Sequence, residues 1–203
     1  MASRVLSPGS ICRLMIMDHF FIALLHYPVY DKNGQVVTTA VVNMDVHDIS
    51  RSARTFGVRK FYIVTPIEQQ RRLVQQIMNH WQQGYGAHYN PSRKEAFALV
   101  ALKGSLAEVI EDIGAIAGRK VRLVVTGAGL PGDLVSCGAL RQRMEEDRNP
   151  YLLVFGTGWG IAGEVLEKSD YRLEPVRGSC DYNHLSVRSA VAIVLDRLWG
   201  DRG

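Results

Sequence analysis

The chain has 203 residues, of which 47% are hydrophobic and 22% charged, a composition typical of a globular protein with a full apolar core. No uncharged apolar run approaches the roughly 18 residues that a membrane-spanning helix needs. This favours a soluble protein over a helical membrane protein, and an odd number of cysteines fits a reducing cytoplasm. The three cysteines lack the spacing of zinc ligands, and the six histidines form no H-x-x-x-H pair. We therefore predict neither a disulfide nor a metal site.

The positive charge is concentrated in the first half of the chain. Residues 1–100 hold 11 Lys or Arg against 6 Asp or Glu, whereas residues 101–203 hold 13 against 14. Such a distribution suits a polyanion that binds the N-terminal half, although solvated helix faces account for it equally well. Most of the excess comes from eight residues: Arg51, Arg54, Arg59, Lys60, Arg71, Arg72, Arg93 and Lys94.

Apart from its first residues, the chain reads as a single α/β domain. We expect residues 1–16 to be a disordered or non-native extension and residues 17–203 to form one domain without internal repeats. Strand and helix patterns alternate with short connections, which is typical of a largely parallel sheet. Strands are predicted at 19–26, 36–42, 60–65, 95–103, 121–126, 151–155 and 171–174, and helices at 45–55, 67–83, 105–117, 133–147, 161–168 and 185–199.

The connection at 84–93 has the sequence GYGAHYNPSR, which is polar, aromatic and contains glycine. Its rings, on Tyr85, His88 and Tyr89, suit stacking on unpaired RNA bases beside Arg93 and Lys94. A long connection without a function is the alternative interpretation.

Glycine or other small residues follow three of the predicted strands, at 126–128, 156–160 and 174–178. In an open parallel sheet, ligands bind beyond the carboxyl ends of the strands, and glycine lets a ligand lie directly against the backbone. We therefore predict that the three segments line one crevice. The P-loop pattern Gly-x-x-x-x-Gly-Lys-Ser/Thr is absent, which argues against a nucleoside triphosphatase. The glycine turn also comes too late in the chain for a typical dinucleotide fold.

Three segments, in this order, carry a family resemblance. Residues 41–66 read VVNMDVHDISRSARTFGVRKFYIVTP, residues 151–161 read YLLVFGTGWGI, and residues 173–198 read LEPVRGSCDYNHLSVRSAVAIVLDRL. They resemble the three signatures of the SPOUT superfamily of S-adenosylmethionine-dependent RNA methyltransferases. The resemblance covers about residues 17–200. It is strongest to a bacterial branch found alone or fused C-terminally to tRNA (guanine-N1)-methyltransferase.

The resemblance implies a SPOUT-like α/β knot, in which a deep C-terminal trefoil knot accompanies a mostly parallel sheet with helices on both faces. It also implies a homodimer with active sites near the subunit interface. A separate argument for a dimer is the helix at 185–199, which is apolar nearly all round.

The resemblance further implies the cofactor and the residues of the site. S-adenosylmethionine would bind at Thr126, Gly127, Phe155, Gly156, Thr157, Gly158, Trp159, Gly160, Ile161, Pro175, Asn183, His184, Leu185 and Ser186. Arg51 matches the catalytic arginine of the first signature and Asn43 its asparagine. Asp45, Asp48 and Asp181 are the candidates to take a proton, and the candidate RNA contacts are Arg54, Arg59, Lys60, Arg93 and Lys94.

The sequence thus predicts an S-adenosylmethionine-dependent RNA methyltransferase that acts on tRNA or rRNA. One alternative is a non-catalytic RNA-binding or assembly module with the same knotted fold, and another is a nicotinamide- or flavin-binding α/β protein. Asp45 stands where ribose methyltransferases of the superfamily usually have a second asparagine, so the methylated atom stays open.

Overall fold

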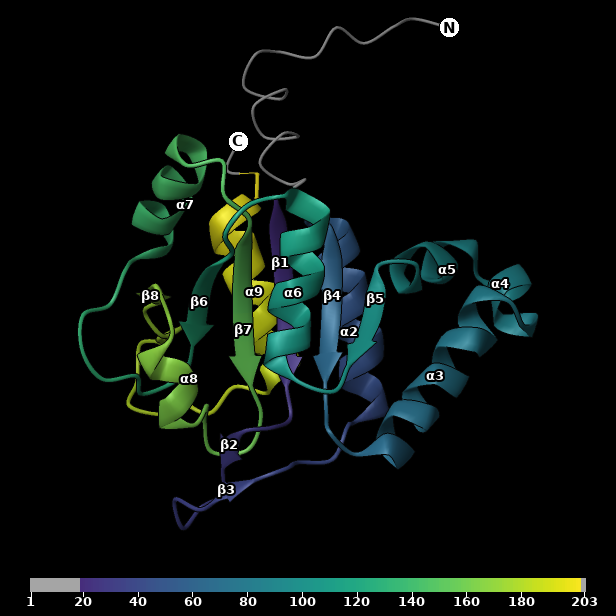
Figure 1. The fold of residues 1–203 in the computed structure, drawn as a ribbon, viewed down its shortest axis with the longest axis horizontal. Coiled ribbons are helices and arrows are strands. Elements are labelled where there is room, and N and C mark those ends of the chain that lie inside the picture. Colours follow the sequence, from purple (N-terminus) through teal and green to yellow (C-terminus); the bar gives the residue numbers. More distant parts are fainter. Residues whose placement is uncertain (1–18, 202–203) are drawn as a thin grey trace, which may run out of the picture.

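A computed structural model describes residues 19–201 of the chain (Figure 1). Its centre is a six-stranded sheet of order β5-β4-β1-β7-β6-β8, in which every pairing is parallel. A separate antiparallel pair, β2 with β3, follows the first strand. The strands are β1 (Phe20–Leu25), β2 (Val29–Tyr30), β3 (Val36–Val37), β4 (Lys60–Val64), β5 (Val100–Lys103), β6 (Arg122–Thr126), β7 (Tyr151–Gly156) and β8 (Tyr171–Arg172).

The sheet is built around β1. All six of its residues are buried, as expected of an uninterrupted apolar strand that is covered on both faces. Its neighbours come from distant parts of the chain: Ala23 pairs with Tyr62 of β4 on one side and with Val154 of β7 on the other.

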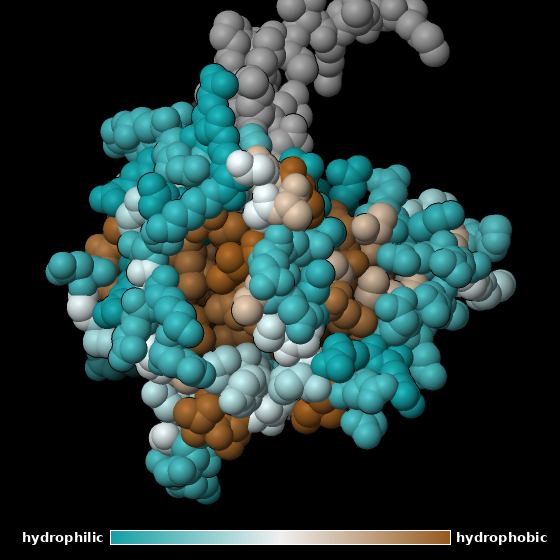
Figure 2. Space-filling model, viewed as in Figure 1, coloured by the Kyte–Doolittle hydropathy of each residue, from teal (hydrophilic) through white to brown (hydrophobic). Residues whose placement is uncertain are grey.

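Helices cover both faces of the sheet, which confirms the predicted α/β architecture. Alternate side chains of β1, such as Ile22 and Phe21, point into two separate apolar clusters. The first cluster packs under α2 (Asn43–Thr55), α7 (Cys137–Glu146) and α9 (Val187–Trp199), and the second under α6 (Leu106–Ala117) and α8 (Gly163–Glu167). Figure 2 shows apolar surface on either side of α6, because this single long helix covers only the middle of its face.

Residues 68–97 form a helical extension beyond β5, at the edge of the sheet (Figure 1). It consists of α3 (Glu68–Gln82), α4 (Tyr85–Tyr89) and α5 (Pro91–Phe97). The predicted loop at 84–93 and strand at 95–103 were therefore wrong in part. Asn90 accepts a hydrogen bond from the backbone N–H of Arg93, and Pro91 occupies the first turn, so that a helix begins where a loop was expected.

Two other predicted elements are shorter than expected. The helix predicted from residue 133 begins at Cys137, because the Ser136 hydroxyl caps it by accepting from the N–H of Ala139. Val135 instead lies beside Leu173 in an isolated parallel bridge. The strand predicted at 36–42 ends at Val37, and the residues that follow approach the carboxyl edge of the sheet.

The predicted N-terminal extension, residues 1–16, lies outside the described residues. Within residues 19–201, no helix is long and apolar enough to cross a bilayer.

Candidate functional site

A cavity of about 1050 Å³ lies at the carboxyl edge of the sheet. Its walls include the segments that follow β6 and β7 and the segment that follows β8, as the glycine pattern predicts. Parallel neighbours β6 and β7 end side by side, which brings loops 30 residues apart in sequence into one wall. The volume is at the upper end of the range for small-molecule sites, and the cavity therefore has room for more than one ligand group.

The glycine turn after β7 is held by the strand β2. Tyr30 accepts a backbone hydrogen bond from Trp159 at 2.9 Å and donates one to the carbonyl of Gly160 at 2.8 Å. Gly158 has a φ of +60°, and a Cβ at this position would lie 2.7 Å from the carbonyl oxygen of Tyr30. Glycine is thus required here both by the backbone angle and by the close approach of a second chain segment.

A partly buried row of hydrogen-bonded side chains lies next to this turn. The Nδ1 atom of His26 lies 3.0 Å from the Thr39 hydroxyl, which in turn contacts the hydroxyl of Thr157. Thr157 also donates to the carbonyl of Leu25 at 3.0 Å. Burial lowers the pKa of His26 to about 4, so its ring is neutral at pH 7. These hydrogen bonds fix the segment after β3 against the glycine turn.

An ion pair between α2 and α9 forms another part of the wall. Asp45 is only 6% exposed, and its carboxylate accepts a hydrogen bond from the guanidinium of Arg188 at 3.1 Å. Arg188 also lies 3.7 Å from Asp48, which is half exposed. Asp45 and Arg188 both line the cavity. A buried carboxylate is stable here because it has a charged, hydrogen-bonded partner.

The other predicted catalytic residues lie outside the cavity lining. Arg51 is on α2 with its side chain 60% exposed, 3.8 Å from Asp48. Asn43 is the exposed first residue of the same helix, and Asp181 is exposed on the segment between β8 and α9. Among the predicted catalytic residues, Asp45 is the one that the structure brings into the cavity wall.

The predicted cofactor residues, in contrast, are brought together. All of them line the cavity: Thr126, Gly127, Phe155, Gly156, Thr157, Gly158, Trp159, Gly160, Ile161, Pro175, Asn183, His184, Leu185 and Ser186. Asn183 donates to the carbonyl of Ala128 at 3.1 Å, and this bond joins the segment before α9 to the segment after β6.

The predicted RNA contacts are dispersed over the surface. Lys60 begins β4, at the end of the sheet opposite the cavity, and its ammonium lies 2.9 Å from Asp112. Arg59, beside it, lies over the ring of Phe21. Arg54 pairs with Glu95 at 3.1 Å, which joins α2 to the helical extension. Arg93 and Lys94 belong to the extension itself.

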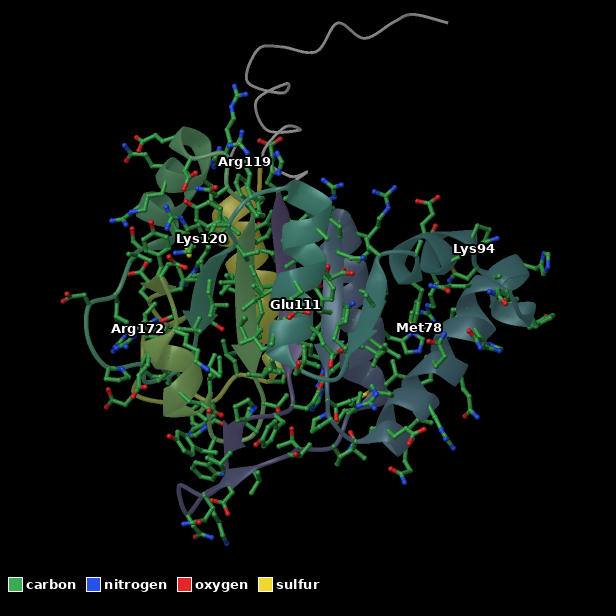
Figure 3. All side chains as sticks on the ribbon, in the orientation of Figure 1. Met78, Lys94, Glu111, Arg119, Lys120 and Arg172 are labelled. Carbon is green, nitrogen blue, oxygen red and sulfur yellow. The ribbon has the colours of Figure 1, made fainter. Side chains whose placement is uncertain are left out.

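Several cavity residues were not identified from the sequence, among them Tyr30, Thr39, Leu130 and Arg188. Tyr30 and Thr39 belong to the connection between β1 and α2, which has no glycine pattern. Arg172, labelled in Figure 3, is a further supporting residue: its guanidinium donates to the carbonyls of Pro131 at 2.7 Å and Leu166 at 3.3 Å. It thereby fixes the segment after β6 to β8 and α8.

The cavity has the chemistry of an adenosine site. Apolar side chains such as Leu130, Ile161 and Leu185 suit the faces of a purine ring, and the glycine turn lies in the same wall, where the missing Cβ atoms let a ligand approach the backbone. The charged Asp45 and Arg188 lie in the same wall and suit a polar, reacting end of a ligand.

Comparisons with known proteins agree with this geometry. Residues 19–200 match the model of a family described as SAM-dependent RNA methyltransferase. A protein of Aquifex aeolicus named only as uncharacterized is 46% identical over 186 residues, which cover 92% of this chain and 91% of that protein. The tRNA (guanine-N(1)-)-methyltransferase of Oleidesulfovibrio alaskensis is 42% identical over 90% of this chain, but the match spans only 42% of that enzyme.

Solved structures share the fold at low sequence identity. The SpoU methyltransferase AviRb from Streptomyces viridochromogenes, solved with AdoMet, superposes with a TM-score of 0.55 at 19% identity, over 89% of this chain and 57% of that one. The TrmH/SpoU tRNA modifying enzyme of A. aeolicus superposes with a TM-score of 0.53 at 15% identity, over 93% and 79%. With the family model matching nearly all of the described residues, the chain belongs to the S-adenosylmethionine-dependent RNA methyltransferases and has their SPOUT fold.

Proposed function

We propose that the chain methylates a nucleotide of tRNA or rRNA, with S-adenosylmethionine held in the cavity at the carboxyl edge of the sheet. The observation that carries the proposal is the glycine turn at 156–160, which β2 fixes in the wall of a cavity large enough for a cofactor and an acceptor group. The relatives named as tRNA (guanine-N(1)-)-methyltransferases favour tRNA, although this chain matches less than half of their length.

The cofactor residues act mainly by positioning. S-adenosylmethionine supplies a methyl group on a positively charged sulfur, ready for in-line transfer. The backbone of the glycine turn and the apolar side chains opposite it would hold the adenosine part, and Asn183 keeps two of the walls at a fixed separation. Correct orientation of the reacting groups supplies much of the acceleration in such a transfer.

Methylation of a ring nitrogen or a hydroxyl releases a proton, and the site must accept it. Asp45 is the buried carboxylate of the cavity wall, and we assign it this role, with Arg188 fixing its orientation. Arg51, Asn43 and Asp181 are exposed around α2 and the segment before α9. We assign Arg51 to the RNA backbone, because a guanidinium holds a phosphate well but does not act as a base.

We further propose that the active protein is a homodimer with a trefoil knot, as in its superfamily. Most apolar residues of α9 are covered within the chain itself, including Val191 and Leu195, so this helix alone does not require a partner. The support comes instead from exposed apolar side chains beside the cavity. Val42, Met44 and Leu185 are 46%, 55% and 47% exposed, and burial of such a patch favours association.

Isothermal titration tests the cofactor. We expect S-adenosylmethionine and S-adenosylhomocysteine to bind at one site per subunit, and NAD not to bind. Transfer of a tritiated methyl group to bulk RNA from a strain that lacks the gene tests catalysis. Arg51→Ala and Asp45→Asn should reduce the transfer, whereas Arg119→Ala, an exposed residue after α6, should not.

The results separate the possibilities. Cofactor binding without methyl transfer to any RNA fraction would leave a non-catalytic RNA-binding module. Binding of NAD in place of both methyl-cycle ligands would exclude the proposal.

A further inference from the structure

The helical extension, α3 to α5, has an unusual distribution of charge. Residues 69–94 include no Asp or Glu, while they contain Arg71, Arg72, Arg93 and Lys94, two histidines and six glutamines. The acids that flank this run are already paired: Glu68 with Arg72 at 2.6 Å, and Glu95 with Arg54 at 3.1 Å. Between these two ion pairs the surface of the extension carries no negative side chain, and it is largely hydrophilic at the right-hand end of Figure 2.

Two tyrosine rings stand on this surface. Tyr85 and Tyr89, one turn apart on α4, are 75% and 74% exposed. Their rings stack on each other, with centroids 5.9 Å apart and planes 22° apart. Since each ring uses only one face in this contact, the outer faces stay open to solvent. The pair can therefore continue its stack with other flat, aromatic groups.

The helix that carries the two tyrosines packs closely against Trp81. Gly86, between them, packs so tightly that a Cβ there would lie 2.7 Å from the ring of Trp81. The guanidinium of Arg93 also packs against Trp81, 4.5 Å from the centroid of the indole ring. The Nε atom of Arg93 is buried. This packing holds α4 in place, so that a ligand need not order the two tyrosines when it binds.

Lys94 adds a positive charge on α5, the helix that directly follows α4. It is exposed (Figure 3), and within the described residues its ammonium makes no ion pair or hydrogen bond. Its ammonium is thus available to a ligand. Exposed rings beside an available cation form the combination by which proteins hold single-stranded nucleic acid, through stacked bases and a neutralised phosphate.

We propose that Tyr85, Tyr89 and Lys94 form a docking site for unpaired nucleotides of the RNA substrate, separate from the methyl-transfer cavity. The proposal extends the function proposed above. The extension lies beyond β5, whereas the cavity is formed at β6, β7 and α9, on the other side of the sheet centre (Figure 1). The RNA would therefore contact the protein at two places. Unpaired nucleotides fit better than a duplex, because only unstacked bases offer their faces to the rings.

Fluorescence anisotropy with a 5′-fluorescein RNA of 12 nucleotides that cannot pair with itself tests the site. Replacing both rings, Tyr85→Ser with Tyr89→Ser, should weaken binding about tenfold, within the range for loss of base stacking. Tyr85→Phe with Tyr89→Phe keeps the rings and should stay within about twofold of the wild type.

The charge has its own matched test. Lys94→Ala should lower the slope of log affinity against log salt by about 0.7, as expected for one phosphate contact to a single strand. Lys120→Ala is the control, because this exposed lysine lies away from the extension, at the turn after α6 (Figure 3). It should leave both the affinity and the slope unchanged.

The proposal is overturned if the double serine variant binds the RNA as the wild type does, or if the phenylalanine variant loses as much affinity as the serine variant. Equal binding of a 12-base-pair duplex would also overturn it. Photocrosslinking of the wild type to 4-thiouridine RNA, with the modified residues located by mass spectrometry, gives an answer that needs no variant. Crosslinks should map to 85–94.

Titration with S-adenosylmethionine separates this proposal from the function itself. The double serine variant should bind the cofactor normally while RNA binding is lost. If the wild-type protein binds RNA through the rings but does not bind the cofactor, the docking site is supported and the proposed methyltransferase function is overturned.

Discussion

The guanidinium of Arg188 on α9 lies 3.1 Å from the carboxylate of Asp45 on α2, across 143 residues of sequence. Because Asp45 is buried, the pair should contribute far more than a surface ion pair. In a double-mutant cycle of Asp45→Asn and Arg188→Gln, we expect a coupling of about 1–3 kcal/mol in the free energy of unfolding. Urea denaturation of the four proteins measures it.

The control for this cycle is the pair Glu68 and Arg72 on α3, whose side chains are 62% and 74% exposed. Its coupling should be roughly 0.5 kcal/mol or less, because water screens the charges. Strictly additive effects at Asp45 and Arg188 would show that the buried contact contributes nothing.

The glycine turn allows a second test. Gly158→Ala places a Cβ 2.7 Å from the Tyr30 carbonyl and forces a side chain into a left-handed backbone conformation. The turn must shift, and we expect the affinity for S-adenosylmethionine to fall at least about tenfold. Gly178→Ala, with open space around its Cβ, should bind as the wild type does in the same titration. Equal losses in the two variants would contradict this explanation.

His26 makes the stability depend on pH. Its pKa is about 4 in the folded chain and 6.5 when exposed. As the pH falls from 6.5 towards 4, His26 is therefore protonated in the unfolded chain but stays neutral in the folded one. The free energy of unfolding should fall by roughly 3 kcal/mol over this range from His26 alone. In His26→Gln this part of the slope should disappear, as chemical denaturation between pH 4.5 and 7 would measure.

The proposed dimer predicts the effect of a charge at its surface. Met44→Glu places a carboxylate in the apolar patch beside the cavity, and we expect it to shift the protein towards a monomer in sedimentation equilibrium. Ile116→Glu is the matched control, since Ile116 is 36% exposed on α6, which packs on the opposite face of the sheet from α2. A wild type that sediments as a monomer at all concentrations would rule out the dimer.

The cavity was predictable because its main walls follow from one rule. Glycine and small residues after β6, β7 and β8 had to meet, since the ends of parallel strands lie at one edge. Tyr30 and Thr39 carry no such signal. Their positions depend on a two-residue strand and on hydrogen bonds to the glycine turn, and neither leaves a periodic pattern.

The helical extension shows a different limit. The pair Asn90 and Pro91 is a known start of a helix, but the apolar residues at 96–102 also resemble a strand. Tertiary packing decides between them: Phe97 is buried against Trp81 and His47 at the end of α5, and the strand begins only at Val100. Likewise, α7 begins at Cys137, four residues after the predicted start at residue 133, because Ser136 caps it.

The position of β1 in the sheet has a consequence for synthesis on the ribosome. One edge of β1 pairs with β4, which follows within 45 residues. The other edge stays unpaired until β7, which begins at Tyr151, has been synthesised. Until then a nascent chain presents an apolar strand with unsatisfied backbone groups along one side, the kind of edge that recruits other chains. Early release or a stalled ribosome before Tyr151 should therefore yield fragments that aggregate, and chaperones that bind extended apolar segments should be needed most in that interval.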